Sequence, residues 1–132
     1  MPLTTASDAL KDRTKRFALR IIRLCRCVPR TPESRVISYQ LLRSGTSVAA
    51  NYRAACRARS SAEFVAKLGL VLEEADESLF WLELLVEAGI ITHIRIECLL
   101  AEANALVAIF VASLKTAKAN PKSRGGTEIH RC

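Results

Sequence analysis

The chain has 132 residues, half of them hydrophobic, which is enough for one domain with a sizeable buried core. This apolar content excludes a wholly disordered protein, and the presence of only five glycines and four prolines disfavours a many-stranded sandwich or barrel. Lysine and arginine together number 20 against 13 acidic residues, and the resulting formal net charge of +7 is compatible with anionic partners.

Hydrophobic periodicity and end signals predict helices along the whole chain. The first helix is expected over about residues 7–28, because apolar residues recur every three or four positions and Pro29 stops the run. The second is expected over about residues 32–58, since Thr31 is an N-cap candidate followed directly by proline. Gly45 lies inside this second helix and weakens it by about 1 kcal/mol relative to alanine.

Two further helices follow in the second half of the chain. The third is expected over about residues 61–88 and begins with a capping box. The fourth is expected over about residues 92–119 and begins with a threonine N-cap. The residues that mark these ends are Ser60, Glu63 and Gly89 for the third helix and Thr92, Asn120 and Pro121 for the fourth.

Short connections require successive helices to run antiparallel, so the predicted fold is all-α, an antiparallel up-down-up-down four-helix bundle over residues 1–120. Residues 121–132 are expected to form a flexible basic tail. The longest charge-free apolar stretch, residues 103–114, is shorter than the ~20 residues that span a bilayer. The N-terminus also lacks the features of a signal peptide, so we expect a soluble, cytoplasmic protein with no membrane partner.

The third predicted helix is apolar nearly all round, with a core-facing stripe and a second apolar flank. One bundle core cannot cover both faces, which favours burial of the flank in a neighbouring subunit of an oligomer. The alternative is that the large flanking residues are simply half-covered within one chain. The predicted oligomer-interface residues are Leu70, Phe80, Trp81 and Leu85.

Positive charge is concentrated in the first half of the chain. Residues 1–60 hold 13 lysines and arginines and three acids, whereas residues 61–132 hold seven and ten. Three interpretations stay open: a solvated helical face, a contact with the acidic side of a neighbouring subunit, and a phosphate-binding surface. For the last of these, the predicted nucleic-acid-binding residues are Arg13, Arg16, Arg20, Arg23, Arg26, Arg53 and Arg57.

Three sequence blocks occur in order: LLRSGTSVAAN at residues 41–51, EFVAKL at residues 63–68 and EADESLFWLELL at residues 74–85. Together they resemble the bacterial family of four-helix-bundle proteins encoded in 23S ribosomal RNA intervening sequences, to which the accessory variability determinant of diversity-generating retroelements is related. The resemblance covers about residues 17–114 and implies an antiparallel bundle that assembles as a ring-like homopentamer. For the retroelement relatives it also implies a basic nucleic-acid-binding surface and a reverse transcriptase partner. Ala54 departs from the pattern, because members usually have an acid there.

The sequence contains little that favours catalysis. The five cysteines form no CxxC motif and no zinc-type pair with histidine, so we expect reduced cysteines used as small core residues. His93 is expected at the surface and His130 in the tail, and the acidic run at residues 73–77 lacks the Glu-x-x-His pairs of di-metal bundles. We therefore expect no enzyme activity, no metal and no cofactor.

The leading hypothesis is a non-enzymatic homo-oligomeric module, pentameric as the resemblance implies, that binds DNA or structured RNA electrostatically. It would serve as an accessory to an RNA or reverse-transcriptase system. Sparse aromatic residues argue against a stacking platform for single strands. The alternative is a protein-interaction scaffold whose basic half serves oligomer assembly and has no role with nucleic acid.

Overall fold

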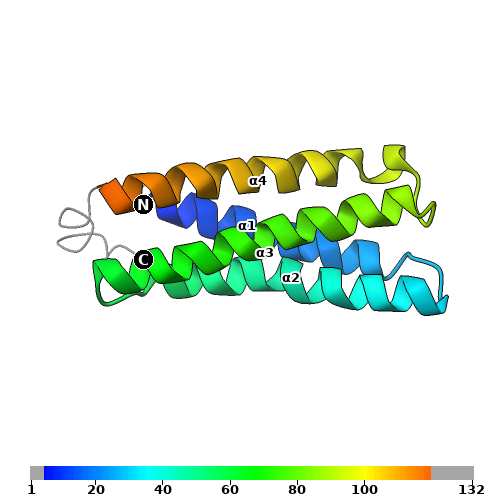
Figure 1. Cartoon of the computed structure of the whole chain (residues 1–132), viewed down its shortest axis with the longest axis horizontal. Helices are drawn as coiled ribbons and strands as arrows, with labels where there is room; N and C mark the ends of the chain where they lie inside the picture. Colours follow the sequence, from blue (N-terminus) through cyan, green and yellow to red (C-terminus); the bar gives the residue numbers. More distant parts are fainter. Residues whose placement is uncertain (1–4, 120–132) are drawn as a thin grey trace, which may run out of the picture.

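The computed structural model describes residues 5–119 as an all-α bundle, which confirms the predicted fold class (Figure 1). Its helices are α1 (Ala6–Cys25), α2 (Pro32–Cys56), α3 (Ser61–Glu87) and α4 (His93–Ala119). Consecutive helices run antiparallel and pack closely, whereas α1 and α4 touch much less. The tail predicted at residues 121–132 lies outside the described residues.

Polar side chains fix where the first three helices begin. Thr5 caps α1 by accepting a hydrogen bond from the Asp8 backbone N–H at 3.0 Å, and the Asp8 carboxylate accepts one from the Thr5 N–H at 3.5 Å. Thr31 accepts from the N–H of Ser34 at 3.2 Å, and Ser60 accepts from the N–H of Glu63 at 3.1 Å. The caps predicted for α2 and α3 are therefore present.

The junction between α3 and α4 is less regular. Gly89 adopts a φ of +74°, which an L side chain rarely tolerates, and its N–H donates to the carbonyl of Val86 at 3.0 Å. α4 begins at His93, and the Arg95 N–H donates to the Thr92 carbonyl at 3.1 Å. Ile96 has a non-helical φ of −123°, so the first turn of α4 is kinked away from the rest of the helix.

The core runs the length of the bundle and is filled by inward-facing side chains from all four helices. Leu85, which we predicted at an oligomer interface, is fully buried at 0% exposure inside this core. That part of the prediction is wrong, because the core-facing stripe of α3 extends round to Leu85. The largest fully buried apolar side chains are Phe17, Ile21, Leu41, Val48, Leu68, Val71, Leu82, Leu85, Leu106 and Phe110.

By length and composition alone, α4 could cross a membrane. In the bundle its inward side chains Leu99, Leu106 and Phe110 are buried against the other helices, and 28% of its most apolar 18-residue window is buried. The absence of a membrane partner stays a prediction.

Gly45 of α2 packs directly against Ile21 of α1. A Cβ atom at this position would lie 2.9 Å from Cγ1 and 3.0 Å from Cγ2 of Ile21, which is itself fully buried. Gly45 is therefore a packing requirement of the bundle as well as a weak point within a helix. Ser44 lies beside it and accepts a hydrogen bond from the Ser78 hydroxyl at 3.0 Å, so a polar pair on α2 and α3 is satisfied at the same level.

We expect Gly45→Ala to lower the free energy of unfolding by about 1–3 kcal/mol, because overpacking against Ile21 outweighs the gain in helix propensity. Gly69 in α3 is the matched control, since a Cβ there meets nothing within 4 Å. Gly69→Ala should instead stabilise by about 0.5–1 kcal/mol. Urea denaturation of both variants measures the difference. Equal stabilisation by the two substitutions would show that Ile21 yields freely.

Candidate nucleic-acid interface

The arginines predicted to bind nucleic acid do not form one surface, and Arg13 is already engaged. Its Nε donates to Oε2 of Glu102 at 2.7 Å and its Nη2 donates to Oε1 at 2.8 Å, which gives a bidentate ion pair between α1 and α4. This hydrogen bonding raises the pKa of Arg13 and lowers the pKa of Glu102. We therefore remove Arg13 from the predicted interface.

The other predicted arginines of α1 share the side of the bundle that faces α4, whereas Arg26 lies apart from them. Arg16 and Arg20 line a depression of about 310 Å³ together with Arg13 and Glu102. Arg16 pairs with Asp12 one turn earlier at 3.0 Å, and both side chains are well exposed. Arg20 and Arg23 lie with Arg95 along a shallow depression of about 270 Å³ between α1 and α4. Arg26 lines a separate depression at the connection between α1 and α2. Arg16, Arg20 and Arg23 therefore line two neighbouring depressions between α1 and α4, and Arg26 lies apart from them.

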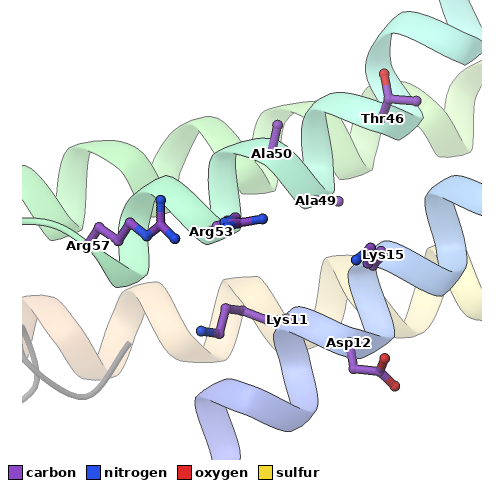
Figure 2. A pocket seen from close by; sticks show the side chains of 8 residues that line it. All are labelled: Lys11, Asp12, Lys15, Thr46, Ala49, Ala50, Arg53 and Arg57. Atoms are coloured by element: carbon purple, nitrogen blue, oxygen red, sulfur yellow. The ribbon is translucent and has the colours of Figure 1, made fainter.

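Arg53 and Arg57 line a groove that lies between α1 and α2 and has a volume of about 550 Å³ (Figure 2). The facing helix α1 contributes Lys11 and Lys15 to the same groove, so cations stand on both sides. The complete lining is Lys11, Asp12, Lys15, Thr46, Ala49, Ala50, Arg53 and Arg57.

Helical spacing explains why these cations face one another. Lys11 and Lys15 are four residues apart on α1, and Arg53 and Arg57 are four residues apart on α2. Residues at this spacing share one face of a helix and lie ~6 Å apart along its axis. Since α1 and α2 run antiparallel, the N-terminal half of α1 is opposite the C-terminal half of α2. The two rows of cations therefore flank one groove.

Little within the described residues neutralises the groove. Lys11 has an exposed contact with Asp8 at 3.4 Å, and the carboxylate of Asp12 is shared with Arg16. No ion pair with Lys15, Arg53 or Arg57 occurs among residues 5–119. Exposed pairs such as the first are weak and screened by salt, so the groove keeps most of its positive charge.

Sequence reasoning placed the two lysines in the basic half of the chain but did not select them for the interface, and it did not find the groove's small residues. The sequence pattern that indicates the lysines is their spacing: Lys11 and Lys15 are four residues apart, as Arg53 and Arg57 are. No comparable pattern marks Thr46, Ala49 and Ala50, because small residues are common in helices. Their place in the groove depends on the position of α1 beside them.

The acidic side of α3 is partly used inside the chain. Arg43 of α2 forms ion pairs with Glu74, at 3.4 Å, and with Glu77. The indole N–H of Trp81 donates to Glu77 at 3.0 Å, and this bond, with that from Arg43, lowers the pKa of the Glu77 carboxyl. These contacts join α2 to α3, which leaves fewer acids for a neighbouring subunit than the sequence suggested.

The remaining predicted interface residues do reach the surface. Leu70 is 44% exposed and Phe80 is 50% exposed, while Trp81 is half-buried. Phe80 and Trp81 pack edge to face with ring centroids 4.8 Å apart. Leu70 is ten residues from Phe80, or ~15 Å along α3, so the two do not form one compact patch.

The serine, cysteine and histidine side chains that could take part in catalysis or metal binding do not form a common site within residues 5–119. Ser78 is buried and donates to Ser44, and no cluster of three metal-ligating side chains occurs within residues 5–119.

Cys56 is buried and Cys25 is half-buried, and this burial raises the pKa of the Cys25 thiol to about 11. Cys27 and Cys98 are exposed, so the expectation that the cysteines fill the core is wrong for these two. His93 is exposed, and Cys132 and His130 lie outside the described residues.

The chain was compared with known proteins. It matches the model of the family described as 23S rRNA-intervening sequence protein over residues 9–112. A crystal structure from Bacteroides thetaiotaomicron, described as a protein with unknown function from the S23 ribosomal protein family, is 35% identical to it. The match has a TM-score of 0.75 and covers 84% of this chain and 99% of the other. Among curated proteins, the comparison finds no match.

Proposed function

Because this chain belongs to the 23S rRNA-intervening sequence protein family and has a basic first half, we propose that it binds nucleic acid without catalysing a reaction. The observation that carries the proposal is the groove between α1 and α2, where Lys11, Lys15, Arg53 and Arg57 converge and one acid, Asp12, is present.

The proposed contact is with phosphates. Lysine ammonium groups and arginine guanidinium groups donate hydrogen bonds to phosphate oxygens, and neutralising phosphates releases condensed counterions. The groove lining has no aromatic ring on which a base could stack and no asparagine or glutamine to read a base edge. A duplex DNA or a structured RNA, approached by its backbone, therefore fits the groove better than an unpaired strand.

We expect binding of a labelled DNA duplex to weaken steeply with salt. Four phosphate contacts per chain, each contributing about −0.9, give a log–log slope of about −3.6, so affinity falls several hundredfold between about 50 and about 300 mM salt. Fluorescence anisotropy at a series of salt concentrations measures the slope, and a structured RNA of equal length tests the second ligand. Absence of binding to either at the lowest salt would overturn the proposal.

A second candidate function is a protein-interaction scaffold, favoured by the exposure of Leu70 and Phe80 on α3. Homo-oligomerisation, the pentameric ring and a reverse transcriptase partner stay predictions of the resemblance, as does a location in the cytoplasm. The two candidates differ in what the basic groove does. In a scaffold, reversing its charges changes the mass measured by light scattering; in a nucleic-acid-binding protein it changes affinity for the duplex.

A further inference from the structure

On the side of α2, the groove between α1 and α2 is lined by small side chains as well as by the two arginines. Thr46, Ala49 and Ala50 lie on α2, on the same helix as the two groove arginines and opposite the lysines of α1 (Figure 2). The groove has a volume of about 550 Å³ and is open to solvent, so a longer side chain at one of these positions would occupy part of that space.

The cations form two rows, one on each helix. Within each row the two residues are about one helical turn, ~6 Å, apart along the helix axis, and packed helices are ~8–10 Å apart. Lys11 and Lys15 form the row on α1, and Arg53 and Arg57 form the row on α2. A chain of phosphates that runs along the groove can therefore contact both rows at once. A flat surface with the same four charges offers contact from one side only.

This inference rests on the proposed function and deepens it. We propose that Ala49 and Ala50 determine what the groove accepts, because their small side chains admit one phosphodiester strand of a duplex between the two rows of cations. The phosphate oxygens of that strand accept hydrogen bonds from both rows, and its bases stay paired with the complementary strand outside the groove. Binding then depends on the shape of the groove as well as on its charge, and it is independent of base sequence.

The test fills the groove without changing its charge. Ala50→Leu adds volume at an exposed position of α2, and leucine is a good helix former, so the fold is retained. Ala50→Gln adds similar length without adding apolar surface, and Ala49→Leu fills the half-buried neighbouring position. Each is expected to lower affinity for a short labelled DNA duplex at least about tenfold.

Ala66→Leu is the matched control, because Ala66 is an exposed alanine of α3 and does not line the groove. Circular dichroism and thermal unfolding verify that each variant is folded. Loss of affinity in both Ala50→Leu and Ala50→Gln, with Ala66→Leu unaffected, supports the inference.

The outcomes separate this inference from the proposed function. If the filled variants bind normally while reversal of Arg53 and Arg57 abolishes binding, the shape requirement is overturned and the proposed function stands. If neither filling nor reversal changes affinity, both are overturned. Equal loss in the filled variants and in Ala66→Leu would also overturn the shape requirement, since the effect would then not depend on the groove.

Discussion

Replacing Arg53 and Arg57 together by glutamate is expected to lower the affinity of the protein for duplex DNA by at least about a hundredfold. Both side chains line the groove between α1 and α2, and neither has an ion-pair partner within residues 5–119. A hydrogen bond to a charged group contributes about 1.5–3 kcal/mol, and each factor of ten in affinity corresponds to about 1.4 kcal/mol. Loss of two contacts alone therefore gives about a hundredfold, and repulsion by the new carboxylates adds to it.

Helix content should stay unchanged in this double variant, because both residues are exposed. A carboxylate in the last turn of α2 costs a few tenths of a kcal/mol through the helix dipole, up to about 1 kcal/mol. Arg53→Gln with Arg57→Gln removes the cations without introducing acids, and it is expected to show a smaller loss of affinity and a salt slope less steep by about two contacts. Fluorescence anisotropy and circular dichroism measure binding and folding.

The matched control reverses Arg30 and Arg35, which lie at the other end of the same pair of helices and line a different depression. Each double variant lowers the formal net charge by four, since each of two positive charges becomes negative. If binding reflects net charge alone, both lose affinity equally, and the groove would have no special role. A selective loss with Arg53 and Arg57 is the expected result.

Truncating Phe110 to alanine is expected to lower the free energy of unfolding by about 3–5 kcal/mol. Phe110 lies on α4 with 0% exposure, and its ring packs against that of Tyr52 from α2, with centroids 5.5 Å apart. Its removal leaves a cavity at the contact of two helices that are not consecutive in the chain. Since domains of this kind are stable by only about 5–15 kcal/mol, the variant loses a large share of its stability.

Val111 is the adjacent control for this truncation, because its side chain is 49% exposed. Val111→Ala should change the free energy of unfolding by no more than about 0.5 kcal/mol. Urea denaturation followed by circular dichroism measures both variants. Equal effects of the two substitutions would contradict the burial of Phe110 and hence the orientation of α4 in the bundle.

The helices and their order follow from the sequence for local reasons. Each of the first three begins at a hydroxyl residue whose side chain accepts a backbone N–H within the next turn, and Gly89 marks the end of α3 because its φ is positive. Such capping interactions involve residues that are close together in the sequence, so they can be predicted from one sequence alone. Apolar spacing likewise identified five of the seven buried residues of α3, the two others being Ser78 and Leu85.

The partners of the charged residues were not visible in the same way. Arg13 was grouped with the other arginines of α1 because they share a helix, yet Glu102 neutralises it from 89 residues away. Its separation from the free cations depends on how α1 lies against α4. Leu85 was assigned to an outer flank because a single helix sequence does not show how wide its buried stripe is. That width depends on both helices that pack against α3, namely α2 and α4.

From the sequence alone, the chain is an all-α bundle with a basic first half, because helix periodicity, capping and composition are properties of neighbouring residues. The location of the binding groove needed the packed structure. Lys11 and Arg57 are 46 positions apart in the sequence, and they line one groove because α1 and α2 pack antiparallel at the close approach that Gly45 permits against Ile21.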